Sequence, residues 1–495
     1  MGEYLEIRRL LCYFVSQAND LTSHRVNRMF IDSHAHLFYP DFKDDIDAVI
    51  AKAIDSGVGL FVVPATNVAT SREAIALAEK YPEIYACVGI HPLDMAEADE
   101  RSLAEIEQLS QHKKVVAIGE IGLDYYYDTT PREKQLEMFR AQMEIAVRRN
   151  LPIVVHTRES MSDAVDAAEK VIGQNEYWRS QQATANSRFP APKGVFHCYS
   201  GDIRTARRLF ALGFLVSFPG IITFKNSASV NTLRAIGYDH VMLETDSPYL
   251  TPVPDRGKRN DPSYIPIIAK KAAEICGATI EDVARTTTYN AKRLFGIGAL
   301  GDPVFTYKLG RSLYINLTIR CDADCVFCDR KGEAVVKGHN LKIVREPTVR
   351  EVIDEIGDPT RYDEIVFCGY GEPTIRFDAV KEIAAAVKSR NGKVRLNTDG
   401  HGSLINKRNI APEMRGLVDV VSISLNSVDP TQYGQLMRLD GARFHAAMVE
   451  FVLESKKIVP EVVLSVVGMD EVDTLRARKF AEETLGVNYR VRPYF

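Results

Sequence analysis

The sequence predicts an α/β protein with two barrels in series, a (β/α)8 TIM-like barrel followed by a partial (β/α)6 barrel. Three observations support this prediction. Short runs rich in Val, Ile, Leu and Phe alternate with amphipathic segments eight times before residue 250 and six times after residue 312. At 495 residues the chain exceeds one ordinary core, and its 45% hydrophobic content is typical of globular proteins. Glycines and Pro303 interrupt the pattern between the two series.

Eight apolar runs in the first series have the length of buried strands. They are Met29–Asp32, Leu60–Ala65, Tyr85–Ile90, Val115–Gly119, Pro152–Val155, Gly194–Phe196, Phe214–Phe218 and Val241–Leu243. Apolar residues at helical spacing predict helices between them, as in Asp44–Ser56, Ser71–Lys80, Pro131–Arg149 and Thr205–Leu212. Because the carboxyl ends of barrel strands share one mouth, residues far apart in the chain are expected to meet there.

Six side chains that can bind metal fall at or just past the carboxyl ends of these runs: His34, His36, Glu120, His156, His197 and Asp246. Imidazole and carboxylate suit divalent zinc, manganese or magnesium, and strand alternation turns His34 and His36 to the same face. Any one of the six, taken alone, could be an ordinary core or surface residue. Six at matching strand ends predict a two-metal hydrolase site, with Glu120 as the candidate bridge.

This part of the chain resembles the TatD family of metal-dependent deoxyribonucleases, within the amidohydrolase-like barrels. The matching segments are Phe30–Leu37, Gly89–Pro92, Gly119–Asp124, Val155–Arg158, His197–Gly201 and Glu244–Tyr249. The resemblance implies one ion held by His34, His36, Glu120 and Asp246 and a second held by Glu120, His156 and His197. It also implies that Asp246 orients or deprotonates the attacking water.

Three further residues near this predicted site each have two interpretations. His91 is a helper of the metal site, as the resemblance implies, or a packed turn histidine. Arg158 contacts a substrate phosphate, or it is an exposed arginine at the barrel rim. Arg256 belongs to the basic segment 256–259, which follows the Asp246 strand and is either a substrate contact or a solvated loop.

The second series opens with a cysteine loop directly after the apolar run Leu313–Ile319. Cys321, Cys325 and Cys328 have a spacing that can hold three irons of a [4Fe–4S] cluster and leave one iron open. The alternatives are a zinc site or cysteines without a ligand. Zinc is the weaker interpretation, because between residues 329 and 378 the only other candidate ligands are His339 and Cys368.

This half resembles the radical S-adenosylmethionine superfamily. The resemblance rests on the cysteine loop, on Phe327 before its last cysteine, and on a Gly-Tyr-Gly-Glu-Pro segment, in which Tyr370 departs from the superfamily's Gly-Gly-Glu-Pro motif. It implies a cluster on the three cysteines and a cofactor amino group bound at Glu372. The residues predicted to contact S-adenosylmethionine are Phe327, Gly369, Gly371, Glu372, Pro373, Asn397, Ser424 and Asn426. Ordinary strand capping explains the last three equally well.

Six apolar runs in this half fit the open partial barrel that is usual in the superfamily. The five runs after Leu313–Ile319 are Ile365–Phe367, Val394–Leu396, Val418–Leu425, Val462–Val467 and Tyr489–Val491. The predicted domains are an N-terminal extension over 1–28 with a possible helix at Tyr4–Ser16, a hydrolase barrel over 29–296, a linker over 297–311, and a radical-SAM-type partial barrel over 312–495.

The charge balance limits the kind of nucleic acid this protein can hold. The net charge of −4 lies in the first 300 residues, with 34 Lys and Arg against 38 Asp and Glu, while the remainder has 28 of each. Tight non-specific duplex binding needs many phosphate contacts, so the balance argues against it. A nuclease is not excluded, because divalent ions add local positive charge and Arg158, Arg256 and Arg259 could track a short strand end.

The compartment is predicted from two features. No apolar stretch is long enough to span a membrane, and residues 1–28 hold charged residues without a clean apolar core or cleavage site. Eight cysteines, three of them in one loop, fit a reducing compartment better than a disulfide framework. We therefore expect a cytoplasmic protein with no membrane partner.

Together these features predict a bifunctional enzyme. Its first half is a two-metal phosphodiester hydrolase that removes nucleotides from the ends of single-stranded DNA, with the 3′ polarity implied by the TatD resemblance. Its second half needs a [4Fe–4S] cluster, S-adenosylmethionine and an electron donor, and its substrate is left open. Two alternatives remain: the barrel hydrolyses a small ester, amide or cyclic phosphodiester linked to the second half, or the second half is a non-catalytic iron–sulfur or zinc module that regulates the barrel.

Overall fold

The computed structural model describes residues 30–127, 129–176, 178 and 192–493. The described residues form two compact units, which meet in the sequence between Ala299 and Leu300. The predicted extension over 1–28, with its helix at Tyr4–Ser16, lies outside the described residues.

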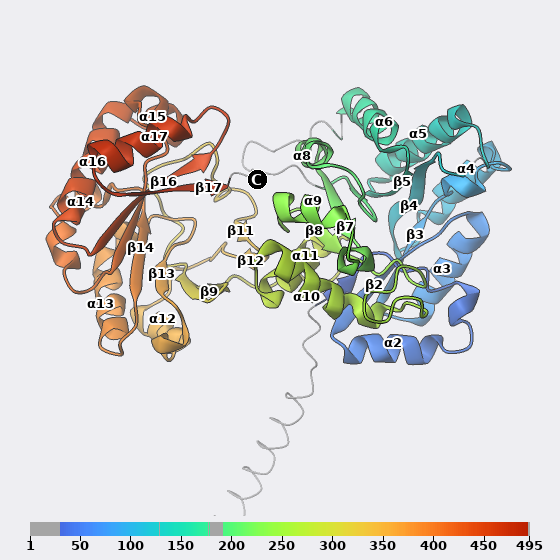
Figure 1. The fold of residues 1–495 in the computed structure, drawn as a ribbon, viewed down its shortest axis with the longest axis horizontal. Coiled ribbons are helices and arrows are strands. Elements are labelled where there is room, and N and C mark those ends of the chain that lie inside the picture. The colour runs from blue at the N-terminus through green and yellow to red at the C-terminus, as the bar shows by residue number, and fades with distance from the viewer. Residues whose placement is uncertain (1–29, 128, 177, 179–191, 494–495) are drawn as a thin grey trace, which may run out of the picture. The chain divides into compact units, whose positions relative to one another are not determined.

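The first unit is a parallel eight-stranded barrel whose strands pair in chain order. The last strand meets the first, because the backbone N–H of Ser33 donates to the carbonyl of Leu243 (3.1 Å) and a parallel bridge joins Ala35 to Ser247. Figure 1 shows helices surrounding these strands. The strands are β1 (Phe30–Asp32), β2 (Val58–Pro64), β3 (Ile84–Val88), β4 (Val115–Asp124), β5 (Ile153–Arg158), β6 (Gly194–Phe196), β7 (Phe214–Phe218) and β8 (Val241–Leu243).

The α-helices described in this unit pack on the outside of the strands. They are α2 (Ile46–Asp55), α3 (Val68–Lys80), α4 (Glu100–Leu109), α5 (Arg132–Arg149), α6 (Met161–Gln174), α8 (Ile203–Leu212), α9 (Ser229–Ile236), α10 (Ile265–Cys276) and α11 (Ile280–Phe295). The predicted (β/α)8 barrel is confirmed by these elements and their order.

Two strands run further than predicted. Because β4 extends to Asp124 and β5 to Arg158, Glu120 and His156 lie inside strands rather than beyond them. The prediction ended the fourth strand at Gly119, since glycine inside a strand usually weakens it. Here close packing requires that glycine, because a β-carbon at this position would lie 2.6 Å from the β-carbon of Val154 on the next strand.

The interior of the barrel is filled with apolar side chains. Each strand contributes to one cluster, which α11 residues also join: Ile31, Val62, Cys87, Val116, Ala117, Val154, Val195, Leu215, Met242, Ala291, Leu294 and Phe295. A barrel packed in this way is a core and not a pore. The polar residues at the carboxyl ends of the strands therefore remain as the place where a ligand can bind.

The second unit contains an open seven-stranded sheet in the order β17-β16-β15-β14-β13-β10-β9. All neighbours pair in parallel except β9 and β10, which are antiparallel. The strands are β9 (Thr306–Leu309), β10 (Ser312–Ile315), β13 (Ile365–Phe367), β14 (Val394–Thr398), β15 (Val420–Ser424), β16 (Glu461–Gly468) and β17 (Asn488–Pro493). A separate two-stranded ribbon is formed by β11 (Val335–Val336) and β12 (His339–Asn340).

Helices connect the parallel strands of this second sheet. They are α12 (Val349–Ile356), α13 (Phe377–Lys388), α14 (Gly402–Ile405), α15 (Pro430–Met437), α16 (Gly441–Lys456) and α17 (Thr474–Lys479). Figure 1 shows α13, α14 and α16 along one side of the sheet, and the apolar core of this unit lies under them. None of the described helices in either unit is both long and apolar enough to cross a membrane.

The six predicted strands of this unit are present as β10 and β13 to β17, so the predicted α/β class and partial barrel are confirmed. The seventh strand, β9, lies within the range predicted as a linker. It forms a hairpin with β10 across Gly310, whose φ of 58° is a left-handed conformation that favours glycine. The four residues of β9 lie between Pro303 and Gly310, and so short a segment has too little alternation to predict a strand.

We expect the first unit to fold without the second, since each unit has an apolar core of its own. A fragment of residues 29–299 should unfold cooperatively in a thermal melt followed by circular dichroism, and it should retain metal-dependent hydrolysis. The full chain is the control. An insoluble or inactive fragment beside an active full chain would show that the two units depend on each other.

Candidate functional site

The carboxylate of Glu120 lies at the centre of the first candidate site. Its two oxygens face two different sets of side chains at the carboxyl end of the barrel. Oε2 lies 3.4 Å from Nε2 of His34 and 3.6 Å from Nε2 of His36. Oε1 lies 2.8 Å from Nε2 of His197 and 2.9 Å from Nδ1 of His156. One buried carboxylate therefore joins two donor sets.

The first donor set has the spacing of ligands around a single ion. The Nε2 atoms of His34 and His36 are 3.2 Å apart, and Oδ1 of Asp246 lies 3.7 Å and 3.6 Å from them. Ligand atoms about 2.1 Å from an ion at tetrahedral angles are about 3.4 Å from one another. Together with Oε2 of Glu120, these atoms fit a divalent ion.

The second donor set has similar spacing. Nδ1 of His156 lies 3.3 Å from Nε2 of His197, and Nε2 of His91 lies 3.5 Å from Oε1 of Glu120. The ligand atoms of His91, Glu120 and His156 lie within 4.8 Å of one another. The six predicted metal-binding residues are thus brought together by the fold, and His91 joins them. His91 also accepts a hydrogen bond from the N–H of Leu93 in the following turn. Its position therefore agrees both with a helper of the metal site and with a packed turn histidine.

The electrostatics of the cluster favour bound positive charge. Burial raises the pKa of Glu120, but His197, His91 and His34 outweigh burial, and the pKa of this carboxyl lies well below its usual range. Burial lowers the pKa of His197, but Glu120 and Glu244 outweigh burial and hold it well above its usual range. Protons therefore stay on His197 to higher pH than on a free imidazole, and divalent ions would have to displace them.

Two carboxylates that the sequence analysis left unassigned lie behind His156 and His197. Oδ2 of Asp124 lies 3.2 Å from Nε2 of His156. Glu244 accepts hydrogen bonds from the N–H of Cys198 and the hydroxyl of Ser217, both at 2.6 Å, and lies 3.7 Å from Nδ1 of His197. Carboxylates behind ligand histidines fix their orientation. Strand alternation could have indicated Asp124 from the sequence, because it places this residue on the same face of β4 as Glu120.

Asp246 occupies an unusual backbone conformation at the end of β8. Its φ of 55° is left-handed, which is uncommon for a residue other than glycine, and its N–H donates to the carbonyl of His34 (2.9 Å). Its side chain is 14% exposed, whereas that of His34 is fully buried. The Asp246 carboxylate is therefore more open to water than the histidine beside it.

The predicted substrate arginines lie over aromatic rings. The Arg158 guanidinium is 3.8 Å from the centre of the Tyr126 ring, and that of Arg256 is 4.4 Å from the Phe224 ring. Both arginines are exposed. Arg259, by contrast, forms an ion pair with Asp45 at 2.6 Å, which removes it from the residues free to follow a strand end.

Comparison with known proteins identifies the first unit. The family model for TatD-related DNases matches residues 31–296, more than half of the chain. The chain belongs to the TatD-related DNase family. YabD of Bacillus subtilis strain 168, described as an uncharacterized metal-dependent hydrolase, is 39% identical over 270 residues, which cover 54% of this chain and 100% of YabD.

Two further TatD relatives agree. YcfH of Escherichia coli K12, also described as an uncharacterized metal-dependent hydrolase, is 35% identical over 275 residues, covering 54% of this chain and 96% of YcfH. The crystal structure of YjjV, a TatD homologue of Escherichia coli K12, is 28% identical with a TM-score of 0.50 and covers 55% of this chain and 100% of YjjV. The first unit is a TatD-type metal-dependent hydrolase domain.

A second candidate site lies in the other unit, beyond the TatD domain. Cys321, Cys325 and Cys328 follow β10, form no disulfide, and are partly buried. Burial raises the pKa of Cys325 to about 12, and Cys328 and Asp399 add to this effect. Buried thiols of this kind become thiolates only when a bound metal compensates their charge. Three of them on one loop fit the ligand set of an iron–sulfur cluster.

A cavity of about 250 Å³ lies beside this loop. It is lined by most of the residues predicted for the cluster and cofactor: Cys321, Cys325, Phe327, Gly369, Gly371, Glu372, Asn397, Ser424 and Asn426. Of the predicted residues, Cys328 and Pro373 do not line it. The sequence analysis missed Asp399, Arg395, Arg490 and Arg492, which also line the cavity and carry no motif.

The Glu372 carboxylate is held by four hydrogen bonds. Oε1 accepts from the N–H and hydroxyl of Thr374 (2.9 and 2.5 Å) and the hydroxyl of Thr398 (2.8 Å), and Oε2 accepts from the N–H of Asp399 (2.9 Å). Burial and the neighbouring Asp399 raise the pKa of Glu372. Two buried acidic side chains next to each other favour a bound cation, and the ammonium group of S-adenosylmethionine fits this requirement.

The glycines of this motif are needed for packing. A β-carbon at Gly371 would lie 2.2 Å from the carbonyl of Thr318, and one at Gly369 would lie 2.5 Å from Oδ1 of Asn316. Tyr370 is accommodated between them because its hydroxyl donates to the carbonyl of Val335 (2.9 Å). The family model for the radical SAM superfamily matches residues 315–478, so the second unit is a radical SAM domain.

Proposed function

We propose that the TatD domain is a two-metal phosphodiesterase that removes nucleotides from the 3′ ends of single-stranded DNA, and that the radical SAM domain reductively cleaves S-adenosylmethionine. The main support for the two-metal phosphodiesterase is the position of Glu120 between two sets of metal-binding side chains. Divalent ions held there would lower the pKa of a water molecule and neutralise charge on the phosphodiester.

The chain's own residues have distinct roles in this proposal. His34, His36 and Asp246 would hold one ion, His156 and His197 would hold the other, and Glu120 would contribute one carboxylate oxygen to each. Asp246 is suited to orient the attacking water and accept its proton, because its carboxylate is partly exposed. Asp124 and Glu244 act as positioning residues behind His156 and His197.

The proposed substrate is a strand end rather than duplex interior. A site at the barrel mouth is concave, and the domain lacks the positive charge needed to grip a stiff duplex. Exposed Tyr126 and Tyr127 beside Arg158 offer surfaces on which unpaired bases can stack. The 3′ polarity comes from the resemblance to TatD deoxyribonucleases, since no residue here indicates a direction.

We expect end-labelled single-stranded DNA to be shortened one nucleotide at a time in the presence of Mg²⁺ or Mn²⁺, and faster than blunt duplex. Asp246→Asn should be inactive, and Asp255→Asn, at a partly exposed residue outside the ligand set, should act like the wild type. Denaturing gels over time would show the ladder. Rapid turnover of a small carboxylic ester or cyclic phosphodiester, with intact oligonucleotides, would favour the alternative substrate instead.

In the radical SAM domain, Cys321, Cys325 and Cys328 would hold the cluster, and Glu372 would bind the amino group of S-adenosylmethionine. A reduced [4Fe–4S] cluster supplies the electron that breaks a carbon–sulfur bond of the cofactor. This role requires an external electron donor. The alternative, a regulatory iron–sulfur or zinc module, leaves unexplained the cavity that joins the cysteines to the Gly-Tyr-Gly-Glu-Pro segment. We also propose a cytoplasmic location, which agrees with the cysteine usage, since none of the described cysteines forms a disulfide.

A further inference from the structure

One face of the radical SAM sheet carries polar side chains where a packed barrel would have apolar ones. Alternate residues on four neighbouring strands line a cavity. Most are polar, namely Arg395 and Asn397 on β14, Ser422 and Ser424 on β15, Ser465 on β16, and Arg490 and Arg492 on β17, while Val420 and Val463 are apolar. The residues between them, such as Leu396, Val421 and Ile423, belong to the apolar core of this unit. In the TatD barrel the inward residues are apolar instead.

The polar face borders a pocket, open to solvent, of the size of a small-molecule site. A cavity of about 570 Å³ lies over β14 to β17 and is distinct from the 250 Å³ cavity at the cysteine loop. Ligand sites commonly measure about 300–1,000 Å³. Arg395, Ser422 and Arg490 line both cavities, so the two meet at these side chains. A ligand in the larger cavity would therefore lie against the proposed cofactor site.

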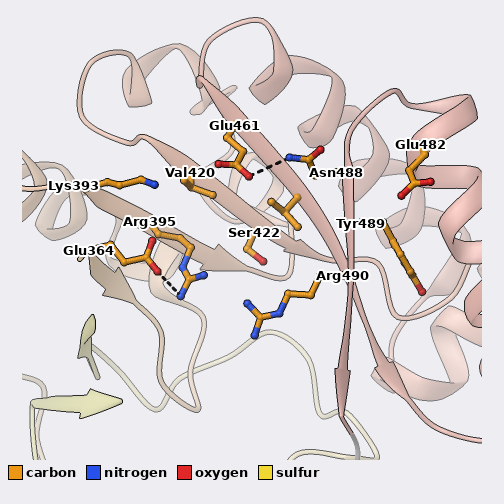
Figure 2. Close-up of a pocket in the computed structure, with 11 residues that line it drawn as sticks. Glu364, Lys393, Arg395, Val420, Ser422, Glu461, Glu482, Asn488, Tyr489 and Arg490 are labelled. Atoms are coloured by element: carbon orange, nitrogen blue, oxygen red, sulfur yellow. Dashed lines mark hydrogen bonds and ion pairs between the residues drawn. The ribbon is translucent and has the colours of Figure 1, made fainter. Parts of the chain in front are cut away.

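The residues at this junction are positive or neutral. Nη2 of Arg395 forms an ion pair with Glu364 (3.0 Å) and a hydrogen bond to the hydroxyl of Tyr314 (3.1 Å), while its buried Nε has no partner. Arg490 is exposed to solvent on β17, and among the described side chains its guanidinium forms no ion pair. Figure 2 shows Arg395 and Arg490 extending into the same space from different strands.

The larger cavity is lined by three carboxylates and three cationic side chains, and none of these carboxylates forms an ion pair with Arg490. Glu364 is paired with Arg395, and Glu461 accepts a hydrogen bond from Asn488 (3.1 Å). Glu482 lies across β17 from Arg490 in Figure 2. Arginine is the side chain best suited to planar, bidentate recognition of phosphate and carboxylate.

We infer that this cavity binds a small molecule bearing an oxyanion, a phosphate or a carboxylate, between Arg395 and Arg490, and that this molecule is the substrate of the radical SAM domain. The substrate role of this molecule rests on the proposed radical function. The binding itself follows from the polar cavity and its arginines, and it does not depend on cofactor cleavage.

Equilibrium binding tests the inference without turnover. Full-length protein, treated with chelator so that the TatD domain holds no ions for phosphate, is titrated calorimetrically with orthophosphate, pyrophosphate, succinate and, as a cationic control, tetramethylammonium. We expect at least one oxyanion and not the cation to bind. Arg490→Gln should weaken this binding by about tenfold or more, because hydrogen bonds to a charged group are lost. Comparing the phosphates with succinate separates the two oxyanion chemistries.

Two matched variants make the result interpretable. Arg350→Gln removes an arginine whose side chain is 91% exposed on α12, and it should bind like the wild type. Arg395→Gln alone would leave the Glu364 carboxylate unpaired and could unfold the domain, so it is made together with Glu364→Gln. This double variant should also lose affinity while keeping the wild-type melting temperature within a few degrees.

The outcomes separate this inference from the radical proposal. Wild-type affinity in both Arg490→Gln and the Arg395→Gln/Glu364→Gln variant, or equal binding of oxyanions and cation, would overturn the oxyanion site. Arginine-dependent binding supports it even if the reconstituted protein fails to cleave S-adenosylmethionine. In that event the radical function fails and the oxyanion site stands.

Discussion

Replacing Glu120 by Gln is expected to lower metal-dependent hydrolysis by about 100-fold or more, because both ions lose a negatively charged ligand. The carboxylate oxygens face His34 and His36 on one side and His156 and His197 on the other. A neutral amide keeps the size of the side chain but cannot offset the charge of two cations. The measurement is the initial rate on a phosphodiester substrate at saturating Mn²⁺.

The same variant should also bind metal more weakly and with fewer ions. Glu105→Gln is a suitable control, since this glutamate is 47% exposed and pairs only with Arg72 among the described side chains. Exhaustive chelation should abolish hydrolysis in the wild type, and Mn²⁺ or Mg²⁺ should restore it. Full activity of Glu120→Gln, or activity that survives chelation, would contradict a two-metal site centred on this residue.

The pH dependence of metal binding has a definite sign. Burial lowers the pKa of His156 and His197, but neighbouring carboxylates outweigh burial and raise both pKa values, so protons stay on both histidines to higher pH than on a free imidazole. Each ion must displace them, and its affinity should therefore rise as the pH increases through neutrality. Calorimetry in buffers of different ionisation enthalpy would detect the released protons.

Much of the barrel and of its candidate metal-binding cluster could be predicted, because two independent sequence signals coincide there. Apolar runs defined the strands, and metal-capable residues such as His34 and Asp246 lay at their ends. The extension of β4 through Gly119 could not be predicted, since it depends on contact with Val154 from another strand. Asp124 has no signal of its own either, because its role appears only when His156 is placed beside it.

The second domain was harder to predict for a physical reason. Its cysteines and Glu372 belong to local motifs, which can be recognised without a fold. Arg395 and Arg490 are 95 residues apart, and no motif connects them, so only the sheet brings both to one cavity. Strand β9 could not be predicted for the same reason. Its four residues have too short an apolar pattern, and the strand forms through its pairing with β10.

Replacing Cys325 by Ala is expected to abolish both iron–sulfur cluster assembly and S-adenosylmethionine cleavage. Anaerobically reconstituted wild-type protein should hold about four irons with matching sulfide and, once reduced, release 5′-deoxyadenosine. A cluster left with only two of its three cysteines from this loop should not survive reconstitution. Iron and sulfide analysis, the visible absorption spectrum, and chromatography of the nucleoside product measure the three properties.

Cys368→Ala is the matched control, because Cys368 lines the same cavity but lies outside the cysteine loop. Only its backbone carbonyl accepts the hydrogen bond from Tyr307, so alanine preserves that contact. This variant should keep the cluster and the cleavage activity, and both variants should keep hydrolysis by the TatD domain. Zinc in place of iron in the wild-type loop, with no cofactor cleavage, would contradict the radical assignment and favour the regulatory alternative.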